Sequence, residues 1–342
     1  MRLATFVHIS DLHFSNKSHD AAVSKIYALF PKLDGFLGHD YKSLVHLEPF
    51  FDNLKSTEQA RLIVSGDLTR VGNSLEFKAA QDYLGAELTP PLGDVGLEEK
   101  DWLKLTGPGN HDRYPGIPFL WGGPTAVYST MFPGMPKVVD IHLASTRGHT
   151  LKLIFVDTDA DVSGWSPKRG GAVGSFTSQI RALRGMLPEK PDELEIRVMC
   201  LHHSRAQRGM FLRIDGNSRQ ELDELIVSHN IKVLLTGHIH DPPLVEISLA
   251  TGPSGSRKYL EARCGTTTQK NLFHLPHYWR NLPGFRSGKP HWSNSLLVHR
   301  LVEENDEIWW DVELVLDAPL DFEIAVPQPP NLMVDPKVRV WP

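Results

Sequence analysis

Short apolar runs rich in β-branched residues recur along the first 240 residues, and they constrain the fold more than any other feature. Each run spans only four to six residues, which is typical of buried strands rather than of helices. The runs are 5–9, 61–64, 103–106, 151–156, 196–201 and 232–235. Stretches with helical spacing lie between them, at 21–30, 44–55, 74–84, 177–187 and 218–229. This alternation of strand and helix predicts an α/β layered fold.

The later part of the chain has a different pattern. Segments 244–249, 258–262, 296–302 and 308–315 look like consecutive antiparallel strands. One domain with two sheets accommodates both parts, so we expect a single domain over 1–317, with loop insertions near 113–135 and 270–293. Prolines cluster from Ala318 onward. Residues 318–342 are therefore predicted to be an extended tail that lies on the surface or on a neighbouring subunit of a homo-oligomer.

Composition excludes several classes of protein. The 342 residues are 41% hydrophobic and 23% charged, as in a folded globular protein. A net charge of -5 gives no overall positive field, which argues against nucleic acid as a partner. No apolar stretch approaches the roughly 18 residues of a membrane helix, and the first residues do not resemble a signal peptide. Only Cys200 and Cys264 are present, both in apolar stretches. Reduced cysteines favour a cytoplasmic location.

Polar residues that can bind metals follow almost every apolar run in the first part of the chain. They are Asp11 and His13, then Asp67, then Asn110 and His111, then His202, and finally His238 and His240. In open α/β sheets ligands bind at the carboxyl ends of the strands, so these side chains can meet although they are far apart in sequence. Any single histidine is more often a surface or core residue, but their joint occurrence at strand ends favours a site.

The types of side chain indicate which metals would bind. Imidazole, carboxylate and one amide oxygen, without thiolate, suit Mn, Fe, Zn or Ni. The donors outnumber the four of a tetrahedral centre, and they suit two ions about 3.5 to 4 Å apart that share a carboxylate.

Five blocks of sequence resemble the signature of the calcineurin-like metallophosphoesterases. The blocks are Asp11-Leu12-His13, Gly66-Asp67, Gly109-Asn110-His111-Asp112, His202-His203 and Gly237-His238-Ile239-His240. They occur in order, each at the end of a predicted strand. The resemblance implies a four-layer α-β-β-α sandwich with two mixed sheets and a dinuclear metal centre above the strands.

The resemblance also implies a role for each residue. Asp11, His13 and His240 would hold one ion, Asn110, His202 and His238 the other, and Asp67 would bridge them. His111 would be left for catalysis, facing the leaving group, with Asp112 or another carboxylate orienting it. Hydroxide held between two cations can exist near neutral pH and attack phosphorus in line. The expected partner is a small phosphate ester.

The spelling of the blocks suggests a branch of the family. The second block runs Gly66-Asp67-Leu68-Thr69, without the Asp-Arg-Gly of the protein Ser/Thr phosphatases. It is more similar to the bacterial cyclic-nucleotide and glycerophosphodiester phosphodiesterases, although Ser204 stands where that branch commonly has Pro. We therefore expect a phosphodiesterase. The alternatives are a phosphomonoesterase or nucleotide-pyrophosphate hydrolase, and an inactive binding scaffold with the same fold.

Several other residues leave two interpretations open. His203 either supports the metal ligands from behind or is an ordinary core residue. Arg113 and the arginines of 205–213 could contact a phosphate or lie in solvent. Asp157 and Asp159 are expected in a turn or cap. The aromatic and basic stretch 273–292 and the segment 116–124 are either functional loops or packed ones. If the first of these loops binds bases, a nuclease remains an alternative.

Overall fold

The computed structural model describes residues 1–14, 42–86, 95–113, 124–162, 166, 168, 172–239, 243–268, 294–317, 322–324 and 338–341. The predicted helix 21–30, most of the segment 116–124, the stretch 273–292 and His240 lie outside the described residues.

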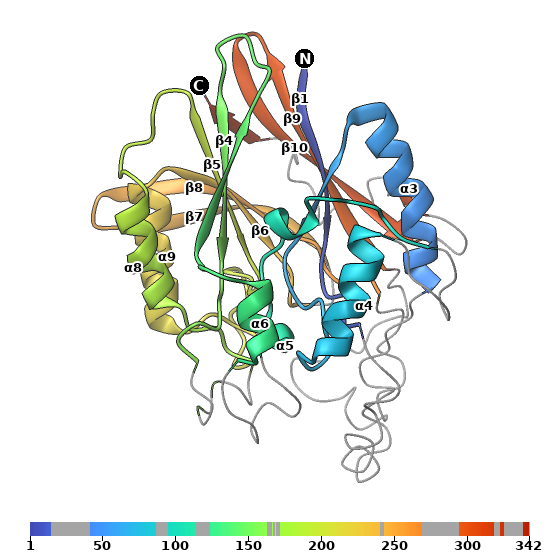
Figure 1. Ribbon diagram of the computed structural model, residues 1–342. Coiled ribbons are helices and arrows are strands. Elements are labelled where there is room, and N and C mark those ends of the chain that lie inside the picture. The colour runs from blue at the N-terminus through green and yellow to red at the C-terminus, as the bar shows by residue number, and fades with distance from the viewer. Residues whose placement is uncertain are drawn as a thin grey trace.

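Two mixed sheets form the centre of the described structure (Figure 1). The first has the order β11 (Phe322–Ile324), β10 (Glu307–Asp317), β9 (Ser295–Glu304), β1 (Arg2–Ile9), β2 (Arg61–Val64), and β12 (Val338–Trp341) also pairs with β10. The second has the order β3 (Lys137–His142), β4 (Thr150–Val156), β5 (Glu195–Leu201), β6 (Ile231–Thr236), β8 (Gly255–Arg263), β7 (Leu244–Gly252). Strands β1 and β2 are parallel, as are β4, β5, β6 and β8 in succession, so their carboxyl ends lie along common edges.

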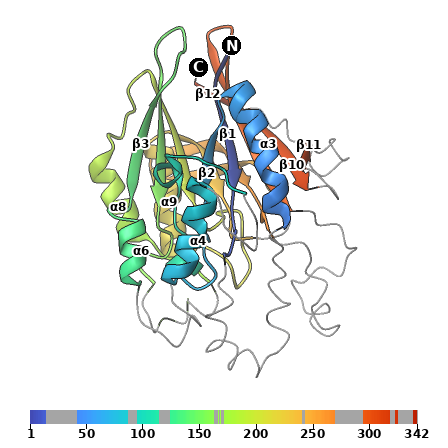
Figure 2. The ribbon, with the colours of Figure 1, turned by 45° about the vertical axis from the view of Figure 1, so that its right-hand side comes forward.

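Helices cover the outer faces of both sheets. Figures 1 and 2 show α3 (Lys42–Glu58) and α4 (Ser74–Gly85) on one side of the molecule. They also show α8 (Thr177–Met186) and α9 (Gly216–Ser228) on the opposite side. The order of layers is therefore helix, sheet, sheet, helix, as the family resemblance implied.

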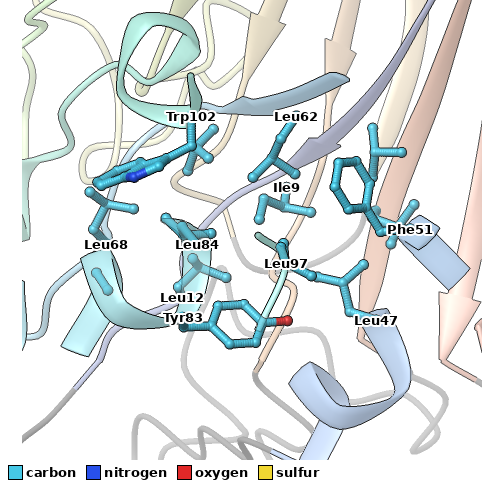
Figure 3. Packing of buried hydrophobic residues seen from close by; sticks show 14 of the residues in the cluster. Ile9, Leu12, Leu47, Phe51, Leu62, Leu68, Tyr83, Leu84, Leu97 and Trp102 are labelled. Atoms are coloured by element: carbon cyan, nitrogen blue, oxygen red, sulfur yellow. The ribbon is translucent and has the colours of Figure 1, made fainter. Parts of the chain in front are cut away.

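Three apolar clusters fill the spaces between these four layers. The first packs Val7, Ile9 and Leu62 against α3 and α4, with Phe51 and Tyr83 among its members (Figure 3). The second lies between the sheets, and the third packs the second sheet against α8 and α9. Neighbouring residues of a strand point to opposite faces, so β1 sends Val7 into the first cluster and Phe6 into the second.

Most predicted elements are confirmed, with small shifts of their ends. The exception is 103–106, predicted as a strand. Residues Trp102–Leu105 form a 3-10 helix, η1, and Thr106 alone makes a parallel bridge to Val64. The Thr106 hydroxyl donates to the carbonyl of Trp102 at 2.7 Å, which favours the local turn. Pro108 follows, and without an N–H it cannot continue a ladder.

The C-terminal strands form two antiparallel hairpins, β7–β8 and β9–β10. They are not one consecutive series, because β8 inserts between β7 and β6 while β9 pairs with β1 in the other sheet. Within the proline-rich segment, β11 and β12 both pair with β10. The edge strand β3 and the short helices α5 (Asn110–Arg113) and α6 (Ala126–Met131) were not foreseen. No helix in the described ranges is both long enough and apolar enough to cross a bilayer.

Candidate metal centre

The turns that follow β1, β2, β5 and β6 meet at one edge of the two sheets. Backbone bonds join the first two turns, from the Asp11 N–H to the Gly66 carbonyl at 3.1 Å and from the His13 N–H to the Asp67 carbonyl at 3.0 Å. The other two turns are joined by a bond from the Gly237 N–H to the His202 carbonyl at 3.0 Å. The His238 N–H donates to Asp11 Oδ2 at 3.0 Å and connects the two pairs.

Four predicted ligands occupy the left-handed region of backbone conformation. The φ angles are 55° at Asp11, 48° at His13, 52° at Asp67 and 67° at His238. Such angles cost about 1–3 kcal/mol for non-glycine residues and cluster at functional sites. These sharp turns end the strands abruptly, so the side chains at their tips stay at the common edge.

Two glycines permit the close approach of these turns. A Cβ at Gly109 would lie 2.1 Å from Asp67 Oδ1. Gly66 has φ of 112°, and a Cβ there would lie 2.7 Å from His202 Nδ1. No side chain fits at either position, which explains the glycine before Asp67 and the glycine before Asn110.

Two groups of side chains could each hold a metal ion, and all of their members are buried except the half-buried His111. One contains His13, Asp67 and His111, and the other contains Asp67, His202 and His238. Asp67 belongs to both groups. Its Oδ2 lies 3.1 Å from His202 Nε2 and 3.5 Å from His13 Nε2.

Backbone carbonyls orient the imidazole rings. A carbonyl only accepts, so His202 Nδ1 donates to Ser65 O at 2.9 Å and His238 Nε2 donates to Ala172 O at 3.3 Å. His202 Nε2 and His238 Nδ1 are left to face each other at 3.1 Å. In the same way His111 Nδ1 donates to Arg70 O at 2.7 Å, and its Nε2 remains for the site.

The electrostatics of the site favour a positive charge among these groups. Burial alone would lower the pKa of His202, but the carboxylates of Asp67 and Asp11 raise it to about 10. Burial alone would raise the pKa of Asp67, yet His202, His111 and His13 hold it well below its usual range. Burial keeps the pKa of His238 well below its ordinary value, so its Nδ1 offers a lone pair. Two ring nitrogens and a carboxylate oxygen that lie within 4.8 Å of one another therefore suit a cation.

The donor set fits metal binding. Asn110 is 5% exposed, and its Oδ1 has no hydrogen-bond partner within the described part of the chain. An unpaired buried amide oxygen is costly unless something else binds it. Nitrogen donors with carboxylate and amide oxygens match the borderline metals expected from the sequence.

Some expectations about neighbouring residues need correction. Asp112 does not orient the His111 ring, because its carboxylate accepts from the Thr69 N–H at 2.8 Å and the Gly109 N–H at 2.9 Å. It ties two turns together instead, and the Arg70 carbonyl orients His111.

His203 lies behind the predicted ligands rather than among them. Its Nδ1 accepts from the Thr158 hydroxyl at 2.7 Å, and its Nε2 donates to Ala172 O at 3.1 Å. Its ring centroid is 4.0 Å from that of His238. The Ala172 carbonyl thus orients both rings, which supports the first of the two interpretations of His203.

Two arginines considered as phosphate contacts are held by carboxylates. Arg113 pairs with Asp157. Arg205 makes two bonds to Asp223, at 2.8 and 2.7 Å. Asp157 also accepts from the Asp159 N–H at 2.8 Å, which is the turn expected there.

The threonines after β8 were not predicted from the sequence. The hydroxyls of Thr266 and Thr268 both reach the carbonyl of Asp11. The sequence offered no signal for them, because they lie at the same edge as His238 only through the parallel pairing of β8 with β6, which the fold decides.

The sequence profile of the calcineurin-like phosphoesterases matches residues 4–242. The chain belongs to the calcineurin-like phosphoesterase family. This confirms the resemblance at the level of the family, whose members typically bind two metal ions, and it assigns no branch.

Solved structures with related folds support the architecture. The chain is similar to GAP50, "the anchor in the inner membrane complex of Plasmodium", with 11% identity and a TM-score of 0.50, over 99% of this chain and 89% of that one. It is also similar to purple acid phosphatase PPD1 from yellow lupin (Lupinus luteus) seeds, with 12% identity and a TM-score of 0.52, over 94% of this chain and 53% of that one. At such identities the likeness concerns the fold alone. No curated protein matches the chain.

Proposed function

We propose that this protein is a two-metal phosphodiesterase for small phosphodiesters of the cyclic-nucleotide or glycerophosphodiester type. The observation that carries the proposal is the pair of candidate ligand groups that share Asp67, with His111 beside the first of them. In this assignment Asp11, His13 and His240 hold one ion, Asn110, His202 and His238 hold the other, and Asp67 bridges them. Mn, Fe or Zn fit the donors.

Two bound cations would lower the pKa of a water molecule bound to them toward neutrality, and they would offset the negative charge of the phosphoryl oxygens. The protein's own groups supply the rest. The ring Nδ1 of His111 donates to the Arg70 carbonyl at 2.7 Å, and the backbone N–H of His111 donates to Asp67 Oδ1 at 2.8 Å. These bonds hold the ring with Nε2 toward the site, where a proton on Nε2 can pass to the leaving oxygen.

The preference for a diester is supported by charge. A phosphomonoester carries a second negative charge, which additional cations would have to offset. Arg113 and Arg205 are already paired with Asp157 and Asp223. The motif spelling points the same way. The departure at Ser204 is accommodated in a buried contact, since its hydroxyl donates to Glu261 at 2.6 Å.

The test is a comparison of substrates with the Mn-loaded protein. We expect faster turnover of bis(p-nitrophenyl) phosphate than of p-nitrophenyl phosphate, and the screen then extends to cyclic nucleotides, glycerophosphodiesters and nucleoside polyphosphates. A clear preference for the monoester or for polyphosphates would favour the phosphomonoesterase or pyrophosphate hydrolase instead.

A second candidate is a scaffold without catalysis. GAP50, which shares the fold, is named as an anchor. Against this alternative, every described ligand position carries a residue that can bind metal. Protein with a full complement of metal and no activity on any of these esters would support the scaffold.

A further inference from the structure

The segment 265–268 follows β8 and lies against the turn that carries Asp11 and His13. Its three threonines are almost completely buried, with exposed fractions of 4%, 0% and 0% for Thr266, Thr267 and Thr268. None belongs to the proposed ligand set, so the function proposed above does not explain them.

The turn at Asp11 to His13 is strained at both ligands, and its N–H groups are held by the turn after β2. The Asp11 N–H donates to Gly66 O at 3.1 Å and the His13 N–H to Asp67 O at 3.0 Å. Asp11 and Leu12 are both 0% exposed, so no solvent reaches the carbonyls between the two ligands. Those carbonyls need partners from the protein.

Threonine hydroxyls are these partners. Thr268 Oγ1 lies 3.0 Å from Asp11 O and 3.0 Å from Leu12 O. Thr266 Oγ1 donates to Asp11 O at 3.2 Å. The Thr267 N–H donates to Ser10 O at 3.0 Å and fixes the segment to the end of β1. We call Thr266 and Thr268 the threonine clamp.

We propose that the threonine clamp positions Asp11 and His13 for one metal ion of the centre. The carbonyl directions of Asp11 and Leu12 set the two peptide planes between the ligands, and these planes set where the two side chains point. Without the hydroxyls, both residues can relax toward negative φ, and the carboxylate and imidazole turn away from Asp67. The proposal rests on the proposed two-metal function.

The clamp should act mainly on one ion, although the bond from the backbone N–H of His238 to Asp11 Oδ2 connects the two sides of the centre. The second group is held by different contacts, since Ser65 O orients His202 and Ala172 O orients His238. A general loss of stability would weaken the binding of both ions together. Loss of positioning would instead weaken the binding of the ion held by Asp11 and His13.

The test is calorimetric titration of the full chain with Mn²⁺, with melting temperatures recorded in parallel. Thr268→Val removes the hydroxyl at nearly constant shape, and Thr268→Ser keeps it. The matched control is Thr236→Val, because Thr236 is 0% exposed and its hydroxyl has no hydrogen-bond partner among the residues described. Thr266→Val tests the clamp separately if the Thr268→Val protein does not fold.

We expect Thr268→Val to weaken one of two binding events by about 10–100-fold, the range known for residues that orient ligands, and to leave the other within about threefold. Thr266→Val should weaken the same event. Thr268→Ser and Thr236→Val should bind like the wild type.

Three results would overturn the proposal: unchanged binding in both valine variants, equal weakening of both events, or a serine variant as impaired as Thr268→Val. Wild-type protein that binds Mn²⁺ but hydrolyses no ester would refute the proposed function and leave the clamp standing. Wild-type protein that binds no metal would refute both.

Discussion

Replacing His111 with Ala separates catalysis from metal binding. His111 is held by its Nδ1 bond to Arg70 and lies edge-on to His13, with ring centroids 4.6 Å apart. If it donates a proton to the leaving group, the variant keeps its metals and loses about 10²–10⁴-fold in kcat. At 1.36 kcal/mol for each factor of ten, this is about 2.7–5.4 kcal/mol of barrier.

The size of the loss should depend on the leaving group. Nitrophenolate departs readily without a proton, so the loss on bis(p-nitrophenyl) phosphate should be near the lower limit of about 10²-fold. An alkoxide needs the proton, so the loss on a glycerophosphodiester should approach about 10⁴-fold. The assay is steady-state turnover at saturating Mn²⁺, together with metal content by elemental analysis.

The control is His142→Ala, because His142 is an exposed residue of β3 that pairs with Thr150 at the start of β4, away from the carboxyl ends of the strands where the predicted ligands lie. It should keep both metal content and turnover. His111 also belongs to a possible ligand group with His13 and Asp67, so its role as a proton donor can be refuted by metal analysis. Loss of metal in His111→Ala equal to that in an Asp67 variant would make His111 a ligand rather than the acid.

Three further predictions concern other residues. Asp67→Ala should lose metal and activity together, since Asp67 is common to both ligand groups; elemental analysis showing full metal content would contradict this. Trp310→Phe removes the Nε1 donor that bonds His299 Nδ1 at 3.0 Å, and the orphaned buried acceptor should lower the free energy of unfolding by about 1–3 kcal/mol in urea titrations. A loss below about 0.5 kcal/mol would mean that this bond contributes little. Burial raises the pKa of Glu76 to about 7, so between pH 4.5 and 7 the folded state binds more protons than the unfolded state, and stability falls as pH rises. Glu76→Gln should remove up to about 3 kcal/mol of this pH-dependent loss of stability. Identical pH profiles of unfolding for the wild type and the variant would contradict the raised pKa of Glu76.

Strand ends were the most predictable part of the site. Asp11, Asp67 and His202 each follow an apolar run that forms a strand, and the residue types alone indicate a metal. These residues lie near one another because parallel strands place their carboxyl ends at a common edge, whatever lies between them in sequence.

Local pattern was less reliable where long-range contacts compete with it. The run 103–106 has the composition of a strand, but only Thr106 finds a partner, and Pro108 blocks extension. The partners of β8 were also not foreseeable, because its position between β6 and β7 depends on bonds between distant segments.

The order of amino acids predicts the alternation of strands and helices and the candidate ligands at the strand ends, because periodicity and strand ends are local properties, whereas the four layers were implied by the family resemblance. Which ring nitrogen faces the site, and which groups hold the strained turn at Asp11, depend on the assembled fold. Ser65 and Ala172 act through their carbonyls and Thr268 acts through its hydroxyl, and the partners of these groups are up to 257 residues away. Such contacts leave no periodic trace in a sequence, since they exist only once both sheets have been brought to the same edge.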